Sequence, residues 1–173
     1  MRPTGICPVC AATHKLTTRG VLPRHAFQAK NVRHGQSIGF HIGGHGGDCP
    51  IGTESGNRTA LRVAQSHDDS AAYLVALPSV TDEEALAAII RDAQDTHLSD
   101  RGSYSNPRPI TAEMRAKYAT PEAFANTSVR FWFSSDAIVY RRNAMERMRA
   151  GEAQAHRDHA TLLRKLVQEN PAP

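Results

Sequence analysis

The chain has 173 residues, of which 40% are hydrophobic and only 6% aromatic, and its formal net charge at pH 7 is +4. No apolar run approaches the roughly 18 residues that a membrane-spanning helix needs, so we expect a cytoplasmic protein without a membrane span. Because alanine supplies much of the hydrophobic fraction, we predict a core of closely packed helices. The length allows one such core and a small additional module.

A Cys-x2-Cys motif formed by Cys7 and Cys10 is the most specific feature of the sequence. Such a turn can present two thiolates to one metal ion, and structural zinc takes four ligands, favouring thiolates with one or two imidazoles. The remaining cysteine, Cys49, starts a Cys-Pro-Ile-Gly turn and offers a third thiolate. We therefore predict a structural Zn²⁺ site with these three cysteines as ligands.

The fourth ligand is expected to be a histidine, and two candidates remain open. Residues 11–25 are typical of a β-hairpin with Gly20 in its turn, which would return His25 to the level of the cysteines. His45 lies four residues before Cys49, and a His-x3-Cys spacing also closes zinc sites. We favour His25. The other histidines of this segment are expected to be exposed or to hydrogen-bond a ligand: His14, His34 and His41.

Other uses of the cysteines fit the sequence less well. A thioredoxin-like redox pair needs a βαβ context, and we expect no strand before Cys7. A disulfide scaffold would leave one odd thiol. Prolines follow both Cys7 and Cys49, which is unusual for ordinary buried cysteines. A metal site is therefore the preferred interpretation.

Residues 7–52 resemble the short zinc-finger modules of uncharacterised bacteriophage and plasmid proteins. The resemblance rests on the Cys7–Cys10 turn, the segment that ends in Arg24-His25, and Cys49-Pro50-Ile51-Gly52. It implies one structural zinc held by Cys7, Cys10, His25 and Cys49, and a mobile-element setting, without implying a reaction. The connection between His25 and Cys49 is longer than is usual in these modules.

Helical patterns follow the cysteine-rich segment. Glu54–Asn57 offers capping residues for a helix through residues 58–77, whose apolar stripe is interrupted, and can be broken, by the polar run Ser66–Ser70. A clearer helix begins at Thr81, which opens a capping box with Glu84. Its apolar face is expected to contain Leu86, Ile89, Ile90 and Ala93.

The middle of the chain combines a loop with short elements. Residues 99–110 contain Gly and Pro and are expected to form a loop. Thr111 is expected to cap a short helix, and Pro121 to start another. The aromatic segment Val129–Phe133 is predicted to be the main anchor of the core.

A long helix is predicted from residue 136 to residue 169, which would make it about 50 Å long. Its apolar stripe is expected to contain Ile138, Met145, Met148, Ala155, His159, Leu162 and Leu166. Because Gly151 and polar residues weaken this stripe, we expect two packed parts with a hinge near Gly151. Self-association through this helix is the alternative.

Patterns for catalysis are sparse. His156 and His159 lie three residues apart and can share a metal, but the sequence ties no third ligand to them. His67-Asp68-Asp69 is explained more simply by a capped break in a helix. A zinc ion with four protein ligands has no open position for a reactive water. We therefore expect a non-enzymatic protein, with a metal-dependent hydrolase as the third choice.

Together these patterns predict a mainly α protein. A zinc-bound β-hairpin module over residues 1–56 is followed by a helical domain over residues 57–173 that ends in a long helix. The expected function is to dock a macromolecular partner. If the partner is nucleic acid, the expected phosphate contacts are Arg19, Arg24, Lys30 and Arg33, joined by Arg141, Arg142, Arg147 and Arg149. The alternative is a protein-binding inhibitor or adaptor in which zinc is purely structural and DNA is not contacted.

Overall fold

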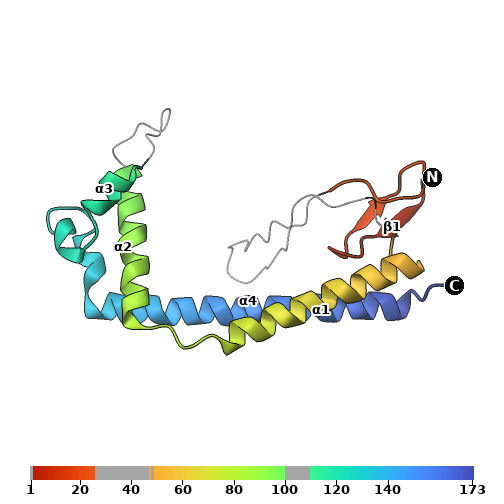
Figure 1. Cartoon of the computed structure of the whole chain (residues 1–173). Helices are drawn as coiled ribbons and strands as arrows, with labels where there is room; N and C mark the ends of the chain where they lie inside the picture. Colours follow the sequence, from red (N-terminus) through yellow and green to blue (C-terminus); the bar gives the residue numbers. More distant parts are fainter. Residues whose placement is uncertain (1, 26–46, 48, 100–109) are drawn as a thin grey trace. The chain divides into compact units, whose positions relative to one another are not determined.

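A computed structural model describes residues 2–25, 47, 49–99 and 110–173. The protein is mainly helical, with a small antiparallel hairpin near the N-terminus and a long C-terminal helix, which confirms the predicted fold class (Figure 1). The chain forms two compact units. Unit 1 comprises Met1–Leu77 and Arg149–Pro173, and unit 2 comprises Pro78–Met148.

Two short strands begin unit 1. Strand β1 (Thr4–Ile6) pairs antiparallel with β2 (Thr13–Lys15), and Gly5 lies opposite His14. The hairpin therefore encloses the Cys-x2-Cys turn, and the expectation that no strand precedes Cys7 is wrong. Three residues are too few to show an alternating pattern in the sequence. No helix lies between these two strands, so the hairpin does not supply the βαβ context of a redox motif.

A separate tight turn follows β2. The Thr17 N–H donates to the Val21 carbonyl over 2.8 Å, and Gly20 adopts a positive φ of 73°, as predicted for the turn. The segment that ends at His25 is thus folded back on itself, although the strand pairing of β2 is with the upstream strand β1.

Helix α1 (Glu54–Ala76) runs through the polar segment that was expected to interrupt it. Thr53 caps its start, because its hydroxyl accepts a 3.1 Å hydrogen bond from the Gly56 N–H. The Ser70 hydroxyl donates to the Ser66 carbonyl one turn earlier, and Asp68 pairs with Arg164. These polar groups are satisfied within a continuous helix, so the predicted break is wrong.

Helix α4 (Ser135–Glu169) is also continuous, and Gly151 causes no break. Its first part belongs to unit 2 and its last part to unit 1, in keeping with the expected division into two packed parts. In unit 1, α4 lies antiparallel beside α1 (Figure 1). Two contacts show this orientation: the Asn57 side chain near the start of α1 donates to the Asn170 carbonyl just after α4, over 3.0 Å, and His67 further along α1 contacts His156 of α4.

The buried face of α4 differs from the predicted stripe. Its buried residues are Ala153, His156, Ala160 and Leu163, whereas Leu162 is 43% exposed and Met148 is 56% exposed. Alanine explains the difference, because Ala60, Ala64 and Ala160 are fully buried between α1 and α4. Small side chains permit the close contact of the helices but contribute little to an apolar pattern that is read from large residues.

Unit 2 begins with α2 (Asp82–Ser99), and its predicted capping box is confirmed. The Thr81 N–H donates to the Glu84 carboxylate over 2.9 Å, and the Glu84 N–H donates to the Thr81 hydroxyl over 3.2 Å. Thr111 caps the short helix α3 (Ala112–Ala116), again as predicted. The predicted loop over residues 99–110 lies almost entirely outside the described residues.

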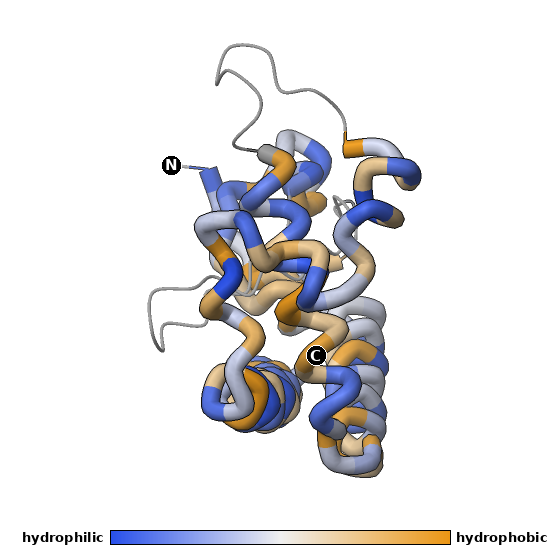
Figure 2. The backbone as a smooth tube through the Cα atoms, turned by 90° about the vertical axis from the view of Figure 1, so that its left-hand side faces the viewer, coloured by the Kyte–Doolittle hydropathy of each residue, from blue (hydrophilic) through white to orange (hydrophobic). Residues whose placement is uncertain are grey.

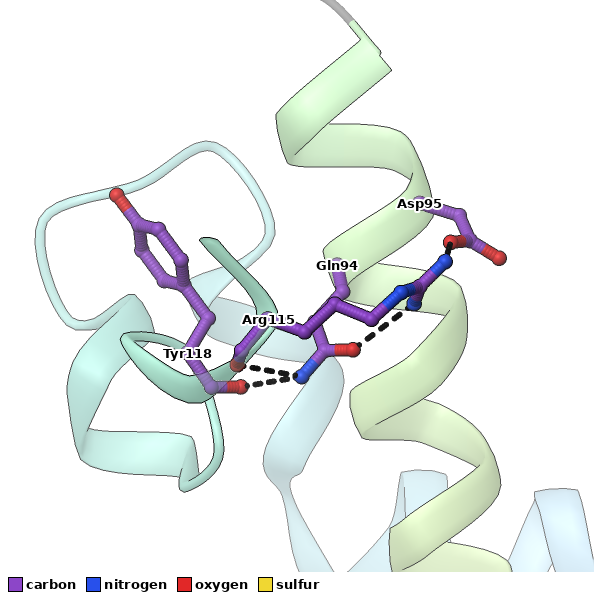
Figure 3. Close-up of polar contacts among 4 residues, drawn as sticks. All are labelled: Gln94, Asp95, Arg115 and Tyr118. Atoms are coloured by element: carbon purple, nitrogen blue, oxygen red, sulfur yellow. Dashed lines mark hydrogen bonds and ion pairs between the residues drawn. The ribbon is translucent and has the colours of Figure 1, made fainter. Parts of the chain in front are cut away.

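A buried amide connects α2 to the segment after α3. The Gln94 side chain donates to the carbonyls of Arg115 and Tyr118 over 3.1 and 2.9 Å (Figure 3). The Arg115 guanidinium returns a hydrogen bond to Gln94 and forms an ion pair with Asp95. One side chain thus satisfies the carbonyls at the end of a helix that is too short to be stable alone.

The core of unit 2 is centred on Phe124, which lies in the 3₁₀ helix η1 (Pro121–Phe124). Phe124 is fully buried with Ala93 and Val129. The aromatic segment forms a second 3₁₀ helix, η2 (Arg130–Phe133), in which Phe131 is 71% exposed. Val129 and Phe133 of the predicted segment pack in this core, whereas the 3₁₀ turn leaves the Phe131 ring outside it.

None of the described helices combines the length and the apolar character needed to cross a membrane. Figure 2 shows the reason, because hydrophilic and hydrophobic positions are interspersed along the helices.

Candidate metal centre

Cys7, Cys10 and His25 form a compact group of metal-ligating side chains. One potential ligand atom from each lies within 4.8 Å of the other two, and Cys10 Sγ lies 3.3 Å from His25 Nε2. Cys7 is buried, and the other two are half-buried. Two sulfurs and one imidazole nitrogen at this spacing can bind a metal ion. Within the described part of the chain, this is the one group of three or more such side chains with this geometry.

The backbone conformation of the cysteine turn places the Cys7 and Cys10 sulfurs on the same side of the turn. The Cys7 N–H donates to the Ala12 carbonyl and the Cys7 carbonyl accepts from the Ala11 N–H, at 2.9 and 3.0 Å. Ala11 has a φ of 58°, so the chain reverses here in the left-handed region. The Val9 N–H lies 3.4 Å from Cys7 Sγ and donates to it. A backbone amide that points at sulfur stabilises the thiolate, which is the metal-binding form.

His25 is held in the tautomer that a metal requires. Its Nδ1 lies 2.7 Å from the Pro23 carbonyl oxygen, which can only accept, so Nδ1 carries the proton. The lone pair of Nε2 then faces Cys10 Sγ. The His14 ring packs against the His25 ring, with 3.8 Å between the centroids and 33° between the planes. A backbone carbonyl and a neighbouring ring therefore fix the orientation of this imidazole.

The two thiols affect each other's protonation. The hydrogen bond between the sulfurs lowers the pKa of Cys7, because the Cys10 thiol stabilises the Cys7 thiolate. The same bond raises the pKa of Cys10. One proton is thus lost readily and the other is retained by the pair. A metal that binds both sulfurs as thiolates must displace the retained proton.

Cys49 is described and half-buried, but it is not a member of the group of three. The segment around it is attached to the same module on both sides. The Gly47 N–H donates to the Leu22 carbonyl over 3.0 Å, and the Ile51 N–H donates to the Ile6 carbonyl over 2.9 Å. His45 lies outside the described residues, so its role stays a prediction.

The module is attached to the helices of unit 1. Ile51 lies in the core with Ala60 and Leu163. His159 Nε2 lies 2.9 Å from the Val9 carbonyl oxygen, at the centre of the cysteine turn. His159 also contacts His67, a residue for which the sequence predicted only a helix break. His67 shares one face of α1 with Ala60, Ala64 and Ala71, and this helical spacing is the sequence signal that could have revealed a buried histidine.

The arginines predicted to contact nucleic acid differ in their surroundings. Arg19 and Arg24 are exposed on the metal module. Arg141 and Arg142 form ion pairs with Asp92 and Asp82, at 2.6 and 2.7 Å, so their charge is already partly balanced. Lys30 and Arg33 lie outside the described residues.

A scan of protein-family models and searches of curated proteins and of solved structures gave no match. The interpretation of the centre therefore depends on its residues and their geometry.

Proposed function

We propose that the protein is a zinc-stabilised, non-enzymatic binding protein whose N-terminal module docks nucleic acid. The observation that carries the proposal is the group formed by Cys7, Cys10 and His25. Thiolates and imidazole together favour zinc over the hard cations, which prefer oxygen ligands. On the resemblance of residues 7–52 alone, we extend the proposal to a phage or plasmid setting.

Cys49 is proposed as the fourth ligand. Three protein ligands leave one tetrahedral position to be filled. The hydrogen bonds of Gly47 and Ile51 attach the segment that carries Cys49 to the module that holds the other three ligands. With Cys49 bound, the zinc has no open position for water, which argues for a structural role. His45 is the alternative ligand to His25.

Charge supports nucleic acid as the partner. Unit 1 carries 12 Lys and Arg against 7 Asp and Glu, whereas unit 2 carries 9 against 10. The positive charge of the protein thus belongs to the unit that contains the metal module. Arg19 and Arg24 are exposed there and available for phosphate. Lys30 and Arg33 are proposed to extend this surface.

The proposal is tested by fluorescence anisotropy with labelled DNA, single-stranded and double-stranded, over a range of salt concentrations. The variant is the double substitution Arg19→Ala and Arg24→Ala. Its matched control is Arg91→Ala combined with Arg62→Ala, which removes the same charge from exposed positions on helices. We expect the first variant alone to weaken binding strongly and to reduce the salt dependence by about one phosphate contact per arginine. Equal losses in the two variants would contradict a specific role of the module.

Exposed aromatic side chains in unit 2 favour a second candidate, a protein-binding adaptor. Phe131 and Tyr140 are both 71% exposed, and Trp132 is 38% exposed. Aromatic residues are enriched in protein interfaces and often dominate their energy. If the adaptor function is correct, a purified candidate partner binds in a manner insensitive to salt, and Phe131→Ser abolishes this binding while Arg19→Ala does not.

A further inference from the structure

Three histidines meet where α1, α4 and the cysteine turn pack together in unit 1. His67 Nδ1 lies 2.6 Å from His156 Nδ1, and the His67 and His159 ring centroids are 4.7 Å apart. His159 Nε2 reaches the Val9 carbonyl oxygen at 2.9 Å. His67 and His156 are only 8% and 7% exposed. The histidines therefore connect two helices to the backbone between the two metal-binding cysteines.

The contacts are those of a hydrogen-bonded chain of imidazoles and not of a second metal site. Two nitrogens bound to one tetrahedral zinc at 2.0–2.1 Å would lie about 3.3 Å apart, which is longer than the distance between His67 Nδ1 and His156 Nδ1. His159 Nε2 is engaged by a backbone carbonyl. The described metal-ligating groups also do not include these three side chains.

The hydrogen bonds define where the protons lie. A carbonyl oxygen only accepts, so His159 carries a proton on Nε2. His67 and His156 share one proton between their Nδ1 atoms, because one nitrogen must donate and the other accept. A second proton on this pair would place two N–H donors face to face between buried alanines. The observed contact between His67 and His156 therefore requires that both of these imidazoles are uncharged.

Burial and the surrounding charges leave His67 and His156 neutral at pH 7. On α1, Asp68 neighbours His67 but is paired with Arg164 of α4. Burial, then the charges of His159 and His156, lower the pKa of His67 to about 4, although Asp68 opposes the shift. Burial also lowers the pKa of His156, opposed by Glu152 on the same helix. From the metal module, the Val9 carbonyl faces the cluster.

We propose that His67, His156 and His159 form a proton-sensitive clasp, which fastens the Cys7–Cys10 turn to α1 and α4 while the His67–His156 pair is neutral and loosens when this pair takes up a second proton. The part of this proposal in which the clasp influences the zinc site rests on the proposed function. The closing of the clasp itself depends only on the protonation and packing of the imidazoles. Acidification would thus loosen the backbone that carries the ligands before the helices separate completely.

The first test follows the imidazole nitrogens of the full-length protein by long-range ¹H–¹⁵N NMR between pH 4.5 and 8. We expect His159 in the Nε2–H tautomer at pH 7, and titration of His67 and His156 well below the ordinary histidine value of 6.5. Titration of His67 and His156 near 6.5 would overturn the proposal. Zinc content is measured on the same samples, so that a failed metal site is distinguished from a failed clasp.

The second test uses the amide ¹⁵N signal of Cys10, which is sensitive to the hydrogen bond accepted by the preceding Val9 carbonyl. His159→Phe removes the donor, and His159→Gln keeps an N–H group at a similar reach. We expect the first variant to shift the Cys10 signal at pH 7 to the position that the unmodified protein reaches at acidic pH, and the second to restore it. A signal unchanged by His159→Phe would overturn the clasp.

The third test measures unfolding in urea through the NMR signals of Ala60 and Ala160, which report on unit 1. A His67 pKa of about 4 in the folded state against 6.5 when unfolded implies that the folding equilibrium constant falls about 30-fold between pH 7.5 and pH 5. His67→Leu should abolish this loss, and the control His97→Leu in unit 2 should retain it. The same pH dependence in His67→Leu and in the unmodified protein would contradict the proposal.

Discussion

Replacing Cys10 with serine should unfold the metal module and leave the helices intact. The hydrophobic cluster of the module consists of three buried side chains, Cys7, Val9 and Leu22. At about 2 kcal/mol for each buried side chain, they contribute about 6 kcal/mol. Structural zinc supplies about 10–16 kcal/mol to small zinc-binding domains. On the proposed function, zinc is therefore expected to make the larger contribution, and the short strands β1 and β2 should not persist without it.

The assay is a ¹H–¹⁵N correlation spectrum of the full chain, recorded with and without zinc. In Cys10→Ser, signals from residues 4–25 should collapse to the positions of an unfolded chain, while those of α2 and α4 remain dispersed. Arg19→Ala is the matched control, because this exposed residue lies in the same module and should leave the spectrum folded. The reasoning is refuted if Cys10→Ser still binds one zinc per chain and keeps a folded module.

Three further predictions concern the fourth ligand, pH and the helix interface. Cys49→Ser and His25→Gln should each lower zinc affinity at least about 100-fold in a chelator competition while His45→Gln leaves it unchanged. A loss in His45→Gln with none in His25→Gln would assign the histidine ligand to His45. For pH, the folded-state pKa of His67 is lowered to about 4, so the unfolded chain binds the proton first and stability is lost as pH falls from 6.5 towards 4. The loss should reach about 3 kcal/mol in urea titrations of unit 1, and a flat profile would show that His67 is not buried as described. Ala64→Leu should destabilise unit 1 by about 1–3 kcal/mol, because Ala64 is fully buried against α4, whereas the exposed Leu162→Ala should change the thermal midpoint little.

The elements that the sequence predicted well depend on local interactions. The capping box of Thr81 and Glu84 needs only residues three apart, and it starts α2 where expected. The meeting of Cys7, Cys10 and His25 follows from a two-residue spacing and a chain reversal near Gly20. Both depend on few residues and on backbone geometry that is nearly independent of the rest of the fold.

The missed features depend on contacts between distant segments. The segment Ser66–Ser70 is helical partly because Asp68 forms an ion pair with Arg164 on α4, 96 residues later in the chain. The buried face of α4 is built around alanine and His156, and only the antiparallel packing of α1 reveals it. The exposure of Phe131 could not be predicted either, since it depends on a 3₁₀ helix in which Phe133 packs against the core and Phe131 does not. Cys49 remains a predicted ligand on the basis of spacing and resemblance.

The most direct measurement is the zinc content of the full chain, purified without a metal-binding tag, combined with X-ray absorption at the zinc edge. We predict one zinc per chain, with three sulfur neighbours at about 2.3 Å and one nitrogen neighbour at about 2.0–2.1 Å. A chain that holds no zinc, or a shell dominated by oxygen, would contradict the assignment of Cys7, Cys10, His25 and Cys49 as a structural zinc site.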